Sequence, residues 1–541
     1  MPKSMSEVAS GAARRRPVEA PLKPSYDFIV CGAGSSGSVV ARRLAEAAEV
    51  SVLLLEAGGS DDCSSVLEPG LWPTNVGSER DWAFQAEPNP NLNGRVFPMN
   101  MGKVLGGGSS INVMIWARGH RTDWDYFAGE AGDPGWNYAS VLALYRRIED
   151  WGGAPDPAYR GVGGLVYVQP APDPNPIAPA MIEALRSLGL PTFDNPNGRM
   201  MEGAGGASLM DVRMKDGKRE NVFRSYVQPY LDRPNLTVVT GALVTRLIFD
   251  GRRASGVQAI VDGQVVTLAA HSEIVLSLGA INTPKLLMQS GIGDERELRR
   301  ASVPIVQHLP GVGRNFQDHF MIASCMWEFA DPLPPRNNLG EAVAFWKTDS
   351  SLEAPDINIA QIEIPFCSPD LGRFLPGAGC WGLLPAVMRP RSRGRLRLVG
   401  PEPSDGVRIE TDILSDPDDM ATVLRAVELA REVGNSAALR PYVKREVMPG
   451  PSSAAELEQF VRDGAVSYWH QSCTAKMGRD PLSVVDGQLR VYGLDSLRIA
   501  DASILPRITT GNTMAPCVIV GERAADLLKA THGLSVPALA T

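Results

Sequence analysis

The feature that most constrains the fold is a glycine-rich turn near the N-terminus. Residues 26–31 are rich in apolar side chains and predict a buried strand, and the next six are Gly32-Ala33-Gly34-Ser35-Ser36-Gly37. Residues 38–48 predict a helix with one apolar face, and residues 50–55 predict a second strand that ends before Glu56. Glycines there let backbone N–H groups approach a pyrophosphate, which the positive end of the helix attracts.

Glu56 strengthens the prediction of a dinucleotide site. It lies 24 residues after Gly32, where a carboxylate can accept hydrogen bonds from ribose hydroxyls. We therefore predict an α/β protein with a Rossmann-type domain. The turn alone does not separate NAD from FAD.

Composition narrows the class of protein further. The chain has 541 residues, of which 44% are apolar, enough for more than one core. A net charge of −8 argues against nucleic acid as a partner, and no apolar run approaches the roughly 20 residues of a membrane helix. Residues 1–24 do not resemble a secretion signal, and we expect a flexible tail. Seven cysteines without metal-ligand spacing predict reduced thiols, a cytoplasmic location and no metal.

Of two further segments, one is predicted to lie close to the ligand and the other to begin a helix. Residues 102–112 form a glycine-dense loop between apolar stretches, as expected where backbone lies close to a ligand. Residues 279–293 follow a predicted strand at 273–278. We expect Thr283 to cap a helix there and Pro284 to occupy its first position.

The C-terminal part contributes a histidine and an asparagine. Residues 465–478 contain His470, and residues 509–516 contain Asn512, 42 positions later. A neutral imidazole can take the proton of an alcohol, and an amide can hydrogen-bond the same oxygen. Of six histidines, we interpret His120, His271 and His532 as surface or satisfied core residues.

Together these motifs resemble the glucose–methanol–choline family of flavin oxidoreductases, from about residue 26 to about residue 528. Residues 82–119 are similar to its choline dehydrogenase and alkanol dehydrogenase branch. The resemblance implies FAD rather than NAD. It also implies an FAD-binding domain in separate segments (25–162, 203–316 and 467–541) and a substrate domain with an antiparallel sheet covered by helices (163–202 and 317–466).

The resemblance also implies roles for individual residues. His470 and Asn512 are the catalytic pair, and His319 is structural, in contact with flavin-domain backbone. Ile111 stands where some choline oxidases attach FAD through a histidine, so FAD is expected to be noncovalent. Ser472-Cys473-Thr474 departs from the usual Gly-Thr-Cys without touching the catalytic pair. The implied cofactor-binding residues are Gly32, Gly34, Ser35, Ser36, Gly37, Glu56, Ala57, Trp82, Val104, Gly107, Asn112, Val113, Val244, Ala280, Asp501, Ala502, Asn512 and Thr513.

The predicted reaction is oxidation of a primary alcohol to an aldehyde, with hydride transfer to flavin N5 and reoxidation by oxygen or another acceptor. The alternatives are a redox-neutral lyase, and a non-catalytic flavoprotein or light-driven decarboxylase, against which His470 and Asn512 weigh. A quaternary ammonium substrate would need an aromatic cage and a carboxylate. Glu363 is a candidate, but we interpret it as exposed or salt-bridged. The aromatic residues of segment 317–466 fit an apolar or aromatic alcohol better. Oxidase or dehydrogenase activity and the oligomeric state stay open.

Overall fold

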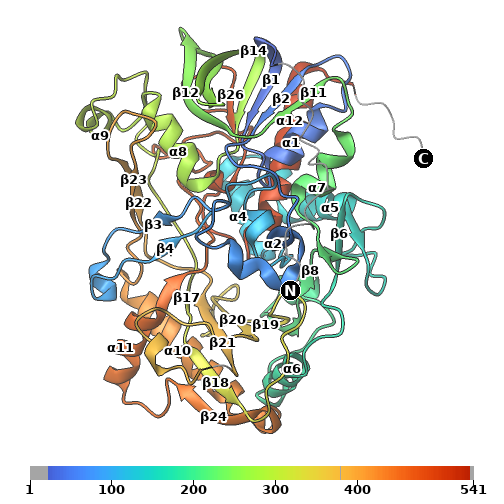
Figure 1. Ribbon diagram of the computed structural model, residues 1–541, viewed down its shortest axis with the longest axis vertical. Helices are drawn as coiled ribbons and strands as arrows, with labels where there is room; N and C mark the ends of the chain where they lie inside the picture. The colour runs from blue at the N-terminus through green and yellow to red at the C-terminus, as the bar shows by residue number, and fades with distance from the viewer. Residues whose placement is uncertain (1–21, 378, 536–541) are drawn as a thin grey trace, which may run out of the picture.

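The computed structural model describes residues 22–377 and 379–535, so the predicted N-terminal tail lies almost wholly outside the described residues. Two sheets form opposite ends of the molecule, with the segments that connect them between (Figure 1). Among the described residues, no helix is both long enough and apolar enough to cross a bilayer.

The first sheet has seven strands in the order β11-β2-β1-β14-β13-β12, with β26 on β14. Strands β2, β1, β14 and β26 run parallel, and β12 to β14 form antiparallel hairpins. Where β1 and β2 pair, at residues 28–31 and 52–55, every residue is apolar because both faces of this part of the sheet are covered. Their bounds are β1 Ser25–Cys31, β2 Val52–Leu55, β11 Leu236–Val239, β12 Ala242–Asp250, β13 Arg253–Val261, β14 Gln264–Leu276 and β26 Leu497–Ile499.

Two helices far apart in sequence pack together on this sheet. Helix α1 (Gly37–Leu44) starts one residue before its predicted start and stops four residues before its predicted end. It contacts α12 (Met514–His532), the last helix of the chain. A Cβ on Gly521 would lie 2.7 Å from the carbonyl oxygen of Ser36, so only glycine allows this approach.

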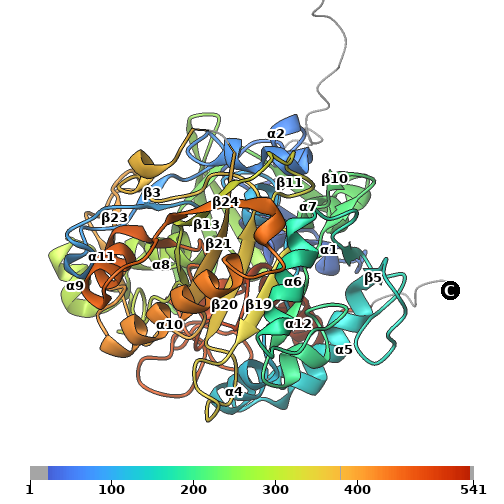
Figure 2. The same cartoon turned by 90° about the horizontal axis from the view of Figure 1, so that it is seen from below.

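The second sheet is antiparallel, with the order β24-β18-β21-β20-β19-β7 and with β17 and β25 beside β21. Helices α10 (Pro417–Gly434) and α6 (Ile177–Ser187) cover one face of it (Figure 2). Side chains alternate between faces, so Ile359 packs in the main core while Ala360 faces a separate apolar cluster. The bounds are β7 Gly206–Leu209, β17 Phe320–Ile322, β18 Cys325–Phe329, β19 Ala342–Trp346, β20 Ile357–Ile362, β21 Cys380–Val387, β24 Val443–Met448 and β25 Ala465–Ser467.

Strand β22 (Arg395–Leu398) lies outside both large sheets and pairs with β23 (Val407–Glu410). Strand β7 lies within a segment assigned to the FAD-binding domain, yet it pairs with β19 of the second sheet. The sequence around β7 carries no sign of this long-range pairing.

The predicted start of the helix near residue 283 is wrong. Helix α8 spans Gly279–Gln289, so Pro284 lies inside it. Proline has no N–H for the carbonyl four residues earlier, that of Ala280, and the hydroxyl of Thr474 donates to this oxygen instead at 2.6 Å. Asp501 caps the helix, because its carboxylate accepts from Gly279 N at 2.9 Å and from Thr283 Oγ1 at 2.5 Å.

Candidate active site

A cavity is bounded by loops that follow strands of the first sheet and by strands of the second sheet, and most of the predicted cofactor residues line it. Gly37, Val104 and Val244 do not. Gly37 has a packing role, since a Cβ there would lie 1.9 Å from the carbonyl oxygen of Gly32. The predicted residues that line the cavity are Gly32, Gly34, Ser35, Ser36, Glu56, Ala57, Trp82, Gly107, Asn112, Val113, Ala280, Asp501, Ala502, Asn512 and Thr513.

The two glycine-rich segments meet at the cofactor end of this cavity. A Cβ on Gly107 would lie 2.7 Å from Cα of Gly34, so the loops touch through their backbones. A Cβ on Gly108, which also lines the cavity, would meet no atom within 4 Å. Backbone is thus exposed to open space beside the N-terminus of α1, the arrangement that accepts a pyrophosphate.

Glu56 lies at the same end, with both carboxylate oxygens held by backbone. They accept from Ala33 N at 2.9 Å and from Gly58 N at 2.8 Å, and burial raises the pKa of this carboxyl to about 7. No lysine or arginine lines the cavity among the described residues. A carboxylate, exposed backbone and the absence of basic lining side chains fit FAD, whose ribose has no 2′-phosphate.

The backbone before His470 is fixed by one buried carboxylate. Asp318 accepts from His470 N at 2.8 Å and from Ser467 Oγ at 2.5 Å. The same hydroxyl of Ser467 accepts from Trp469 N at 2.8 Å. Trp469 has φ 61°, a left-handed conformation that is rare for a bulky residue, so this turn is held against local strain.

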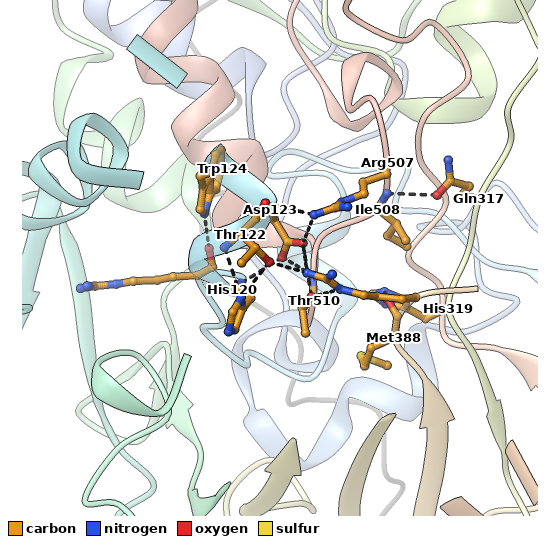
Figure 3. A network of polar contacts seen from close by, with 12 residues as sticks. His120, Thr122, Asp123, Trp124, Gln317, His319, Met388, Arg507, Ile508 and Thr510 are labelled. Atoms are coloured by element: carbon orange, nitrogen blue, oxygen red, sulfur yellow. Dashed lines mark hydrogen bonds and ion pairs between the residues drawn. The ribbon is translucent and has the colours of Figure 1, made fainter. Parts of the chain in front are cut away.

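A chain of hydrogen bonds determines the tautomer of His470. His319 Nε2 lies 3.1 Å from the carbonyl oxygen of Met388, which only accepts, so this nitrogen carries the proton (Figure 3). Nδ1 of neutral His319 is therefore unprotonated and accepts a hydrogen bond; it lies 2.9 Å from His470 Nδ1. His470 must donate from Nδ1, which leaves its Nε2 as an acceptor, 3.1 Å from Asn512 Nδ2.

Both rings are neutral at ordinary pH. Burial lowers the pKa of His319 to about 4. Burial, and secondarily the neighbouring His319, lowers the pKa of His470 well below its usual range. The interpretation of His319 as a structural contact to flavin-domain backbone is confirmed, because its carbonyl oxygen accepts from Tyr468 N at 2.9 Å. Its ring adds contacts that were not predicted, to His470 and to the carbonyl oxygen of Met388 just after β21.

A second buried carboxylate holds the loop that carries Asn512. Asp123, at the start of α4 (Arg121–Ala131), accepts from Thr510 N at 2.7 Å and from Arg389 Nη2 at 2.8 Å (Figure 3). The side chain of Gln317 accepts from Ile508 N at 3.2 Å. The Asn512 loop is thus anchored to α4 and to the segment that bears His319.

The opposite end of the cavity was not foreseen residue by residue. Its side chains are mainly apolar or aromatic and come largely from the second sheet and from the segment before His470. Tyr468 stacks on the ring of His470 at 4.8 Å between centroids. The members are Trp72, Ile115, Met210, Met321, Ile362, Phe366, Leu384, Tyr468 and Trp469. The aromatic residues of 317–466 were the only sequence signal for this end.

Glu363 is neither exposed nor salt-bridged, which corrects that interpretation. Its side chain is buried, accepts from Arg336 N at 2.6 Å and from Asn175 Nδ2 at 3.2 Å, and does not line the cavity. Burial and the adjacent Glu341 raise its pKa to about 8. The sequence does not reveal this buried pair because both partners look like surface glutamates.

The remaining histidine interpretations are confirmed. His120 is buried and caps α4, with its Nε2 3.0 Å from the carbonyl oxygen of Gly203. His271 is exposed, and His532 lies 2.8 Å from a carboxylate oxygen of Glu273. None of the three lines the cavity.

The fold and this site define a flavin-dependent oxidoreductase that acts on CH–OH groups. The chain belongs to the GMC oxidoreductase family, whose N- and C-terminal family models match residues 26–321 and 390–521. It is 36% identical to a protein of Stenotrophomonas maltophilia named oxygen-dependent choline dehydrogenase, over 93% of this chain and 95% of that protein. It is 35% identical to the mitochondrial choline dehydrogenase of Mus musculus, over 94% and 90%. The crystal structure of pyridoxine 4-oxidase from Mesorbium loti superposes with a TM-score of 0.89 at 32% identity, covering 92% of this chain and 98% of that one.

Proposed function

We propose that this protein oxidises a primary alcohol to an aldehyde, with His470 as the general base and Asn512 as the second contact to the substrate oxygen. The observation that carries the proposal is the unprotonated Nε2 of His470, which lies 3.1 Å from the amide nitrogen of Asn512; both residues line the cavity. The names of the relatives, which include choline dehydrogenases and pyridoxine 4-oxidase, support alcohol oxidation.

The two side chains act on one oxygen. A hydroxyl placed between them donates to His470 Nε2 and accepts from Asn512 Nδ2. As the proton moves to Nε2, the amide stabilises the developing alkoxide, and His319 Nδ1 accepts from the imidazolium on its far side. Bound FAD would supply the oxidant, accepting the carbinol hydrogen and its two electrons together as a hydride. The low pKa of His470 keeps Nε2 unprotonated before substrate arrives.

We also propose that FAD is held without a covalent bond, since Ile111 lines the cavity and offers no atom for one. The electron acceptor is oxygen or another oxidant. All seven cysteines lie within the described residues and none forms a disulfide, which supports a reducing compartment such as the cytosol.

The test is anaerobic stopped-flow reduction of the bound flavin by a primary alcohol. His470→Ala is expected to slow reduction by on the order of 10²–10⁴-fold while FAD stays bound. Asn512→Ala is expected to slow it by on the order of 10²-fold, with less than additive loss in the double variant. His532→Ala, outside the cavity, is the control. Reduction of the His470→Ala variant at the parent rate would place the base elsewhere.

A further inference from the structure

The substrate end of the cavity has a chemical character that the proposed reaction does not require. The lining residues at this end carry no charge. The polar ones among them are the amides of Asn338 and Gln361 and the phenol of Tyr468, and each makes a hydrogen bond within the protein, although Asn338 Oδ1 has no partner among the described residues. The lining carboxylates, Glu56 and Asp501, lie at the cofactor end with their oxygens engaged by backbone N–H groups. Among the described residues, no lining side chain at the substrate end can neutralise a cation.

Three aromatic rings form one continuous wall there. Trp72 and Trp469 meet at 6.5 Å between centroids and an interplanar angle of 65°. Phe366 and Trp469 meet at 6.1 Å and 74°. These edge-to-face contacts fix the rings against one another and give an aromatic wall to the cavity that His470 also lines.

The ring of Trp469, which contacts the other two rings, is carried by a strained backbone. Trp469 precedes His470 directly and keeps its left-handed backbone because Ser467 and Asp318 fix the turn. Indole N–H of Trp72 donates to the carbonyl oxygen of Asn338 at 3.0 Å, which fixes the second ring. Strain at a residue that faces a cavity is typical of a ligand contact rather than of core packing.

We infer that the substrate of the proposed reaction is a neutral aromatic primary alcohol. The wall gives a planar ring edge-to-face partners while the carbinol group reaches His470 and Asn512. A trimethylammonium alcohol would lose its hydration with no carboxylate to replace it. Cation–π attraction recovers only a small part of that loss. This inference rests on the proposed function.

Four alcohols test it by anaerobic flavin reduction. Benzyl alcohol is compared with cyclohexylmethanol, which has the same ring size without aromaticity. Choline is compared with 3,3-dimethylbutan-1-ol, its uncharged carbon isostere. We expect kcat/KM to be about 3- to 10-fold higher for benzyl alcohol than for cyclohexylmethanol. We expect the isostere to exceed choline by on the order of 10²-fold.

Variants connect the preference to the wall. Phe366→Leu is expected to lower the benzyl-to-cyclohexylmethyl ratio about threefold, because one edge contact is lost. Phe374→Leu, an exposed phenylalanine on the same connection, is the matched control and is expected to leave the ratio unchanged. The ratio is taken within each variant, and FAD content confirms folding.

The outcomes distinguish failure of the substrate inference from failure of the proposed function. Choline outperforming its isostere, or equal reduction by the two ring alcohols, overturns the substrate inference and leaves the proposed reaction standing. If no alcohol reduces the flavin, the proposed function itself fails.

Discussion

Replacing His319 with leucine removes the one acceptor that the structure provides for the Nδ1–H of His470. The ring of His319 is fully buried and lies 2.9 Å from that nitrogen, so no other protein group takes its place in the described structure. A hydrogen bond to a charged group contributes about 1.5–3 kcal/mol. Because His470 becomes charged as it takes the proton, losing this bond is expected to slow flavin reduction by about 10- to 100-fold.

The pH profile distinguishes this role from simple packing. In the parent, the reduction rate should rise through one ionisation with a midpoint below pH 6.5, because burial lowers the pKa of His470 from that value. The leucine variant loses the acceptor for His470 Nδ1–H, so its plateau should fall, and it loses the neighbouring imidazole that helps to lower the pKa of His470, so its midpoint should move to higher pH. Stopped-flow reduction across pH at saturating alcohol measures both changes.

The conservative variant and a control complete the experiment. His319→Asn supplies an amide oxygen that can accept from His470 Nδ1, and it should recover part of the plateau rate. His532→Asn, whose ring pairs with Glu273 outside the cavity, should match the parent. A leucine variant with the parent's rate and pH profile and full FAD content would show that His319 does not set the tautomer of His470.

Three further predictions concern the cofactor and the buried acid pair. Acid precipitation should release all flavin into the supernatant, since Ile111 cannot form a bond to it; yellow colour in the pellet contradicts this. Glu56→Gln should weaken FAD binding by on the order of tenfold, because the charge-assisted bonds to Ala33 N and Gly58 N are weakened; titration of apoprotein measures it, and an unchanged Kd shows that Glu56 is misassigned. The proton on Glu363 stabilises the fold fully below pH 4.5, and this contribution is lost as pH rises through about 8. Glu363→Gln should therefore flatten the fall of Tm between these pH values, and an equally steep fall in both proteins would rule out this titration.

The sequence predicted those secondary-structure elements that depend on residues close together in the chain. The strand, turn and helix at residues 25–44 form where apolar periodicity and glycines indicate. The start of α8 was misplaced because its capping carboxylate, Asp501, comes from 222 residues away in the chain. Likewise, Pro284 is tolerated inside the helix only because Thr474 bonds the carbonyl that proline leaves free.

In the site, too, local motifs were predicted from the sequence, and features that depend on tertiary contacts were not. His470 and Asn512 were identified from their motifs, and the structure places them 3.1 Å apart. The role of His319 depends on which nitrogen faces Met388, and a sequence carries no information about ring orientation. The acid pair at Glu363 was missed for a similar reason: burial depends on tertiary packing, and charged residues in isolation predict exposure.

The contact between α1 and α12 has a consequence for biosynthesis. Ser36 Oγ donates to the carbonyl oxygen of Cys517 at 2.7 Å, across 481 positions of sequence, and residues from both helix starts line the cavity. A ribosome must therefore deliver nearly the whole chain before the cofactor site can close. Contacts of such long sequence separation form slowly, so the apolar faces of the N-terminal strands stay exposed to solvent until the C-terminal helix packs on them. Flavin supply in the cell should thus govern how much newly made protein escapes aggregation, since the ligand can only trap the last step of folding.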